Sequence, residues 1–235
     1  GYTAGSGNAT GNTVTVTGGT VSGDIVGGYA NVKDASANIV DLGAVTVSGN
    51  VFGGRSGGAG TTNDNTIHLR GTQVSGTVTG GSAAAGTGNT LAVHDFNTSV
   101  QDFSNVQNLH FYLPEETTGN SDRTMLRLGV QHKDIRGIHL GVGISGQQSA
   151  LQKGDIVSLM KVAANGALTT DEALDNDVSG MQGVSLKYQF ALQKRSTDEL
   201  VAIVKDNAVM NEQTKSLVET RSAASAFLNG GADLL

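Results

Sequence analysis

The sequence predicts an all-β protein, a parallel β-solenoid in which each turn of the chain stacks on the turn before it. Two recurring phrases carry this prediction. A Val-Ser-Gly phrase that runs into Gly-Gly begins at Val21, Val47 and Val74, at intervals of 26 and 27 residues. A second phrase begins with an asparagine nine residues before each of these valines. Because both phrases keep the same spacing, they belong to one repeating unit.

The asparagine phrase predicts a strand with one buried face. It begins at Asn12, Asn38 and Asn65 and recurs at Asn89. The second and fourth residues after each asparagine are aliphatic, whereas the residues between them vary, and this alternation is typical of a half-buried strand. The predicted inward pairs are Val14/Val16, Val40/Leu42, Ile67/Leu69 and Leu91/Val93, and the outward residues in register are Thr15, Asp41, His68 and Ala92.

The Val-Ser-Gly phrase predicts a second strand in each turn. Its inward positions are expected to hold an aliphatic residue, a glycine and another aliphatic residue, as in Val21, Gly23 and Ile25. The inward glycine leaves room for a close neighbour. The Gly-Gly pair that follows is expected to form a corner through positive φ angles.

One such turn cannot be stable alone. Burial of each aliphatic side chain contributes about 2 kcal/mol, whereas ordering costs about 1–2 kcal/mol for every residue. Stacked turns pair each strand above and below, so stability comes from neighbouring turns. The repeated asparagines have two interpretations, an amide ladder along one corner or separate turn-forming residues.

Composition agrees with a thin solenoid. The chain of 235 residues has 34 glycines, one proline, no tryptophan and 4% aromatic residues, so its interior suits Val, Ile and Leu. The net charge is −6 and no long cluster of Lys and Arg occurs, which argues against nucleic acid or an anionic membrane as a partner. There is no cysteine and no run of eighteen apolar residues. The opening at Gly1, within repeat-like sequence, suggests a cut through a longer protein.

The character of the chain changes near residue 94. Residues 1–93 carry four acidic and three basic residues, whereas residues 94–235 carry seventeen and twelve, together with five of the six phenylalanines. Strands are expected at 106–113, 124–130, 138–144, 156–162, 184–193 and 200–204. The bulkier core predicts a capping module over residues 94–206, because an open solenoid end is an unpaired edge.

A helix is expected from about Asn207 to Leu228. Met210, Leu217, Arg221 and Phe227 recur at helical spacings, and Gly230-Gly231 would end the helix. The three predicted regions are therefore repeats at 1–93, a cap at 94–206 and a helix within 207–235.

The order of these regions resembles a classical bacterial autotransporter. The residues that carry the resemblance are the glycine-rich turns, the segment 151–159, the strand 184–190 and the final stretch 214–235. The last stretch is the most specific, since it is similar to the segment that leads into the outer-membrane barrel of such proteins. The resemblance implies a right-handed β-helix passenger at the cell surface, with an autochaperone module and a helix that threads a barrel lying outside this chain.

The resemblance also implies which residues matter. The autochaperone core would be Leu109, Phe111, Leu128, Leu140, Val142, Leu159, Tyr188 and Phe190, which ordinary core packing explains equally well. The pore-spanning helix would present Met210, Leu217, Arg221 and Phe227. The implied partners are the chain's own barrel and a host surface or a second copy of the chain.

No residue pattern predicts a cofactor, a metal site or catalysis. The five histidines are scattered and lack cysteine partners, and no Asp follows Gly-Gly at the offset that calcium-binding solenoids use. A polysaccharide-degrading β-helix needs paired outward carboxylates, and only Asp41 and His68 are expected to meet. We therefore expect a non-enzymatic, adhesin-like stem. The alternatives are a fragment of a secreted β-helix polysaccharide-degrading enzyme and a passive spacer.

Overall fold

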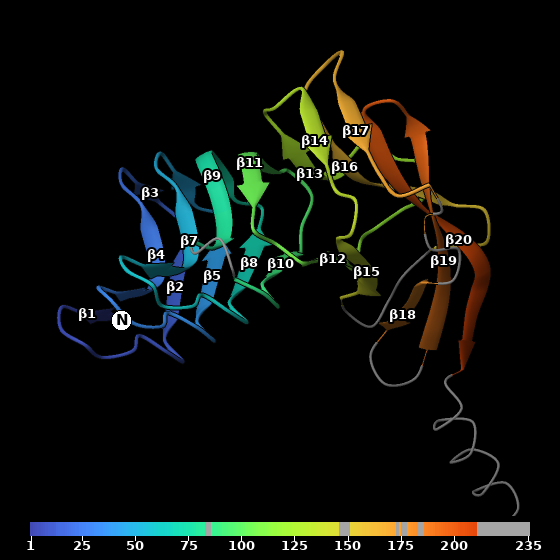
Figure 1. The fold of residues 1–235 in the computed structure, drawn as a ribbon. Coiled ribbons are helices and arrows are strands. Elements are labelled where there is room, and N and C mark those ends of the chain that lie inside the picture. The colour runs from blue at the N-terminus through green and yellow to red at the C-terminus, as the bar shows by residue number, and fades with distance from the viewer. Residues whose placement is uncertain (83–85, 146–150, 173, 175–177, 183–185, 211–235) are drawn as a thin grey trace, which may run out of the picture.

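The computed structural model describes residues 1–82, 86–145, 151–172, 174, 178–182 and 186–210. Within these residues all regular structure is β, and the chain forms a parallel β-solenoid of about five turns, which confirms the predicted all-β solenoid. The turns follow one another along the molecule from the N-terminal end (Figure 1). None of the described residues forms a helix long and apolar enough to cross a membrane.

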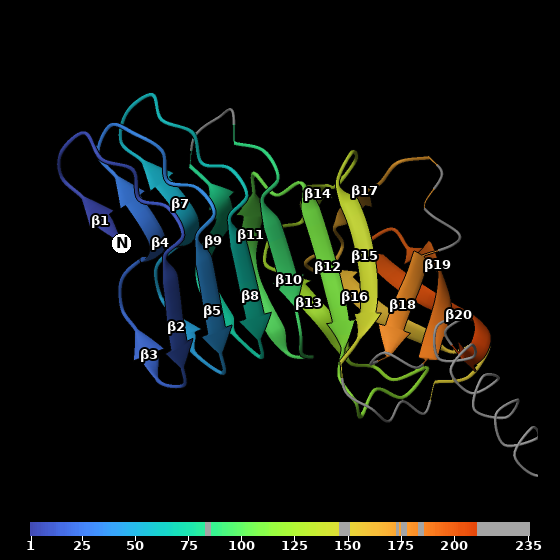
Figure 2. The ribbon, with the colours of Figure 1, turned by 90° about the horizontal axis from the view of Figure 1, so that it is seen from below.

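One face of the solenoid is a parallel ladder built from the asparagine phrases. Neighbouring strands lie side by side along the molecule (Figure 2) and pair with Val14 opposite Val40, Val40 opposite Ile67 and Ile67 opposite Leu91. The ladder contains β2 (Thr13–Thr17), β5 (Ile39–Gly43), β8 (Thr66–Arg70), β10 (Thr90–Val93), β12 (Asn108–Leu113) and β15 (His139–Ile144).

The Val-Ser-Gly phrases build the opposing strands of the first three turns, later segments continue them, and neighbouring strands of this set are also parallel. In the first two turns a break in the middle of the phrase divides it between two strands. In the third turn the whole phrase lies in one strand. The strands are β3 (Thr20–Val21), β4 (Ile25–Ala30), β6 (Thr46–Val47), β7 (Val51–Ser56), β9 (Gln73–Gly81), β11 (Thr98–Ser104), β13 (Thr124–Leu128) and β16 (Ile156–Lys161). Two short parallel pairs complete this part: β1 (Tyr2–Thr3) with β4, and β14 (His132–Asp134) with β17 (Ala167–Thr169).

The core fills the space between these strands, as the alternation predicted. Val40, Leu42, Ile67, Leu69 and Leu91 are all fully buried. The same buried cluster continues through Leu109 and Phe111 to Phe190 in the C-terminal strands. Each side chain packs against its counterparts in neighbouring turns, so removal of one turn would expose the next.

The predicted inward glycines do not reach this core. Gly23 is exposed, and Gly49 and Gly76 are half-buried. They stack on each other so closely that a Cβ on Gly49 would lie 2.5 Å from the carbonyl carbon of Gly23, and one on Gly76 would lie 2.5 Å from the carbonyl oxygen of Gly49. The close neighbour was correctly predicted, but it is the equivalent glycine of the adjacent turn.

Of the two interpretations of the asparagines, the structure contains the amide ladder. Oδ1 of Asn38 accepts from Nδ2 of Asn12 at 2.8 Å, Oδ1 of Asn65 accepts from Asn38 at 3.0 Å, and Oδ1 of Asn89 accepts from Asn65 at 3.1 Å. Each oxygen also accepts the backbone N–H of the preceding asparagine. Gln107 takes the place of the next asparagine, since its Oε1 accepts the backbone N–H of Asn89 at 3.0 Å.

The prediction that the Gly-Gly pairs form corners was wrong. Gly27-Gly28, Gly53-Gly54 and Gly80-Gly81 lie within β4, β7 and β9, and none of them has a positive φ angle. Other groups lie too close to these residues for a side chain: backbone carbonyls of neighbouring segments, Thr62 at Gly81, and the amide ladder at the other five positions. A Cβ on Gly53 would lie 2.7 Å from Cβ of Asn65, and one on Gly54 would lie 2.7 Å from its Nδ2.

The strands after residue 150 change from parallel to antiparallel pairing. β16 pairs with β13 in parallel on one edge and with β20 (Glu199–Met210) in antiparallel fashion on the other. β20 forms a hairpin with β19 (Leu186–Ser196), which pairs in turn with β18 (Val178–Gln182). β18 joins the parallel ladder at Ile144 of β15, which lies opposite Gln182.

The predicted helix start near Asn207 was wrong, because the chain is still in a strand there. β20 continues to Met210, which lies opposite Leu186 of β19, so Met210 belongs to a strand. The strand extends because pairing with β19 satisfies its backbone groups through this point. Leu217, Arg221 and Phe227 lie outside the described residues.

Candidate functional site

The residues predicted to form a folding core are almost all interior. Leu109, Phe111, Leu159 and Phe190 are fully buried, and Leu128, Val142 and Tyr188 are at most 4% exposed. Leu140 is only partly buried. These side chains come from β12, β13, β15, β16 and β19 and share one cluster with the N-terminal turns. Six of the eight therefore support the fold alone, whereas Leu140 and Val142 also line a hollow at the edge of β15.

The outward-facing side chains of the asparagine-phrase strands include the polar residues that the sequence predicted to lie in register. Thr15, Asp41, His68 and Ala92 occupy matching positions in successive strands, as predicted. Although Asp41 is beside His68 in register, its Oδ1 forms an ion pair with Nε of Arg70 at 3.1 Å. His68 turns to the following strand, where its Nδ1 lies 2.9 Å from Nε2 of His94 in a hydrogen bond.

A row of rings continues from this pair toward the C-terminal end of the ladder. The rings of His94 and Tyr112 are stacked with centroids 4.6 Å apart and planes inclined by 6°. His110 makes edge contacts with Tyr112 at 6.4 Å and with His139 at 6.3 Å. We call His68, His94, Tyr112, His110 and His139 the ring row.

The ring row is possible because small residues lie beside it. Ala92 is buried although its side chain is on the outward face. A Cβ on Gly141 would lie 2.6 Å from Cδ2 of His110, and one on Gly143 would lie 3.0 Å from Cδ1 of Tyr112. The rings of β12 therefore extend over the glycines of β15, its partner in the ladder.

Burial keeps the imidazoles of His68, His94 and His110 uncharged at neutral pH, because it lowers the pKa of each. Desolvation, followed by the charges of Arg70 and His68, lowers the pKa of His94 from 6.5 to about 4. Desolvation also lowers the pKa of His68 and, together with the charge of His139, that of His110. A neutral imidazole has one nitrogen that donates and one that accepts, so these rings can recognise hydroxyl or amide groups.

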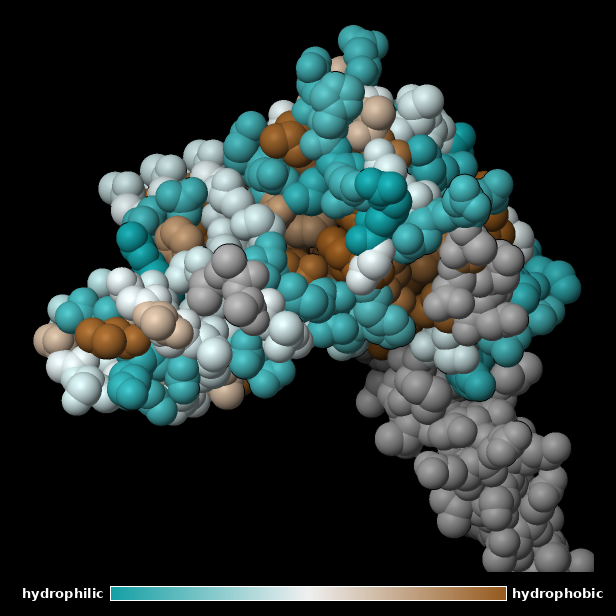
Figure 3. All heavy atoms as spheres, in the orientation of Figure 1, coloured by the Kyte–Doolittle hydropathy of each residue, from teal (hydrophilic) through white to brown (hydrophobic). Residues whose placement is uncertain are grey.

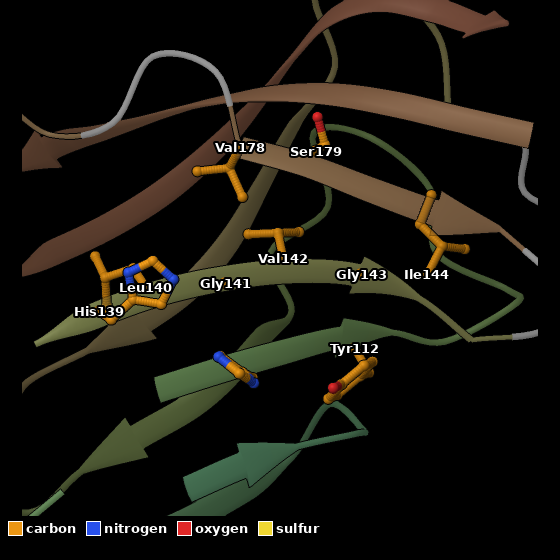
Figure 4. Close-up of a pocket in the computed structure, with 10 residues that line it drawn as sticks. Tyr112, His139, Leu140, Gly141, Val142, Gly143, Ile144, Val178 and Ser179 are labelled. Atoms are coloured by element: carbon orange, nitrogen blue, oxygen red, sulfur yellow. The ribbon is translucent and has the colours of Figure 1, made fainter. Parts of the chain in front are cut away.

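A hollow of about 470 Å³ lies at the end of the ring row, at the seam between β15 and β18. His110, Tyr112 and His139 contribute rings to its lining, and Leu140, Val142 and Val178 contribute apolar groups. Figure 4 shows Val142 and Val178 pointing toward one another from the two strands. Among the described residues of these two strands, only Ile144 and Gln182 are paired in register.

Apolar surface also gathers at the centre of the molecule, between the strands β13 and β16 above and β12 and β15 below (Figure 3). Ile138, Leu140 and Val178 are among the side chains near these strands that pack on the core but stay partly exposed. The interior is thus less completely covered here than in the first two turns, where segments 31–38 and 57–65 close the third side of each turn.

Sequence reasoning treated the histidines separately and missed the ring row. It also missed a buried carboxylate in the C-terminal hairpin. Glu199, 3% exposed, accepts from Oγ of Ser158 at 2.6 Å and from both Nε and Nη2 of Arg195 at 2.8 Å. This network joins the hairpin to β16. Nothing in the described part of the chain brings three His, Asp or Glu side chains together as a metal site.

No family model, curated protein or solved structure matches the chain.

Proposed function

We propose that this chain is a non-enzymatic, surface-exposed stem of an autotransporter passenger, a right-handed and adhesin-like β-solenoid. Residues 94–206 would act as its cap and folding seed and support its export across the outer membrane. The partners would be the barrel that follows the passenger and a host surface or a second copy of the chain. The supporting observation is the change from parallel to antiparallel pairing at β16, whose second edge is occupied by β20.

This arrangement favours folding from the C-terminal end. The hairpin of β19 and β20 joins neighbours in the sequence across Thr197 and Asp198, so its closure costs little chain entropy. Turn-to-turn pairing instead joins residues about one turn apart, for example 26 residues between Asn12 and Asn38. Once the hairpin has covered β16, the other edge of β16 is a template for β13 and the earlier turns.

Refolding kinetics test this order with two matched leucines. Leu200 in β20 and Leu42 in β5 are both fully buried, so each change to alanine should cost about 2–5 kcal/mol. If the hairpin forms first, Leu200→Ala slows refolding, with a φ-value above about 0.5, whereas Leu42→Ala mainly accelerates unfolding, with a φ-value below about 0.3. Equal φ-values, or the reverse order, would contradict the proposed seed.

An export assay tests the cellular role separately. The chain would be fused ahead of an outer-membrane autotransporter barrel, and its exposure to protease added to intact cells would be measured. The wild-type chain should reach the surface, and Leu200→Ala should reduce its display more than Leu42→Ala does. A chain that stays inside although the barrel is inserted would refute the passenger role.

A further inference from the structure

We propose that the hollow between β15 and β18 binds an uncharged sugar, with its ring against the apolar side chains and its hydroxyl groups against His110, His139 and Tyr112. The binding itself does not depend on export, and only its role in adhesion rests on the proposed function.

The lining matches the two kinds of surface that a sugar ring presents. Leu140, Val142 and Val178 offer an apolar side to C–H groups, whereas the imidazoles and the phenol offer donors and acceptors for hydroxyl groups. Ser179 adds a further hydroxyl at the edge of β18. None of the described residues that line the hollow is Asp, Glu, Lys or Arg, so their chemistry suits an uncharged ligand.

The shape favours a small ligand over an extended peptide. The volume of about 470 Å³ is within the range of about 300–1,000 Å³ typical of small-molecule sites. A peptide strand would need to lie between β15 and β18 along their length. A Cβ on Gly180 would lie only 2.9 Å from the carbonyl oxygen of Val142, so there is no room for a third strand at this point.

The rings that face the hollow are held in position. His110 lies over Gly141 and Tyr112 over Gly143, while the second face of Tyr112 packs on His94. Such support reduces the entropy lost when a ligand orders the side chains that bind it. The ring row thus supplies a prearranged polar wall for the hollow.

The test is a titration followed by NMR of the imidazole C–H groups in the full chain. The probes are glucose, galactose, mannose, N-acetylglucosamine, lactose and cellobiose up to tens of millimolar, with glucuronate and an uncharged hexapeptide for comparison. At least one neutral sugar should shift the signals of His110 and His139 while leaving that of His132, an exposed residue on β14, unchanged.

Variants locate the binding. Val178→Phe fills the hollow, and His139→Ala removes an exposed ring without touching the core, so each should weaken sugar binding by about tenfold or more, equivalent to about 1.4 kcal/mol. His132→Ala is the matched control and should leave binding unchanged. Thermal unfolding of each variant verifies that the fold is retained.

Four results would overturn the proposal: no shift with any neutral sugar, binding that both Val178→Phe and His139→Ala retain, equal binding of glucuronate, or binding of the hexapeptide without any sugar. None of these results bears on the refolding or export assays. The failure of the sugar site and the failure of the passenger role are therefore distinguishable.

Discussion

The amide ladder should make internal asparagines far more important to stability than the terminal one. Asn65 is fully buried, and its Oδ1 accepts both the backbone N–H and Nδ2 of Asn38 at 3.0 Å. Asn65→Ala would leave these two buried donors without an acceptor. Each unsatisfied donor costs about 1–3 kcal/mol, so we expect a total loss of about 3–5 kcal/mol in the free energy of unfolding.

Asn12→Ala is the matched control for this prediction. Asn12 donates to Asn38, but among the described residues its own Oδ1 accepts no hydrogen bond. Its change to alanine removes one side-chain hydrogen bond and should cost only about 0.5–1.5 kcal/mol. Urea unfolding followed by circular dichroism measures both losses. If Asn65→Ala costs no more than Asn12→Ala, the ladder does not stabilise the solenoid in the way argued.

Three further changes test other parts of the structure. Gly54→Ala should destabilise the chain by more than about 2 kcal/mol in urea unfolding, because the new Cβ would lie 1.9 Å from the carbonyl oxygen of Ala35; an unchanged midpoint would contradict the close packing. His94 has a folded pKa of about 4, below its ordinary 6.5, so the unfolded chain takes up the proton first and stability falls as pH drops from about 6.5 to 4. The loss should be about 1–2 kcal/mol after reduction for solvent screening of a half-buried ring, and His94→Gln should lessen the fall in Tm across this range. Glu199→Gln should cost about 2–3 kcal/mol, since it weakens the bonds to Ser158 and Arg195; a loss within error would show that the network is dispensable.

The repeating strands were predictable because two signals agree. Alternation placed Val40 and Leu42 inside, and the repeat spacing placed Asp41 next to His68 in register, both as found. The asparagines left two interpretations open, since a sequence shows that an amide recurs but not whether its partner is the next amide or its own backbone. The distance of 3.0 Å between Asn38 and Asn65 decides between them.

The Gly-Gly pairs misled because glycine meets two different physical needs. It allows positive φ, as at Gly18 and Gly19 in a turn, and it removes a Cβ where another group approaches closely, as at Gly53 and Gly54. Sequence alone does not separate these cases. The asparagine in the same repeat was the missing signal, because a buried side chain stacked in every turn needs space on the strand that faces it.

The start of the C-terminal helix was misplaced for a related reason. Met210 fits a helical spacing with the residues after it, but it is also the end of a strand that pairs with β19. Helical periodicity over a few residues is a weak preference, whereas hydrogen bonds to an adjacent strand satisfy every second backbone group. The strand predicted at 200–204 therefore extends beyond the boundary that the helical pattern suggested.

The ring row could not be found from the spacing because the turns differ in length. Equivalent positions are 26, 27, 24 and 18 residues apart along the amide ladder, and the last step replaces asparagine with Gln107. An alignment of the turns that relies on asparagines alone therefore loses the register at this step. Had Gln107 been taken as the next amide, the inward pair would fall on Leu109 and Phe111, and His110 and Tyr112 would follow as outward neighbours of Ala92 and His94. The outward face of a solenoid is thus predictable only as far as its turns can be aligned, and here the alignment fails where the chain begins to build its candidate site.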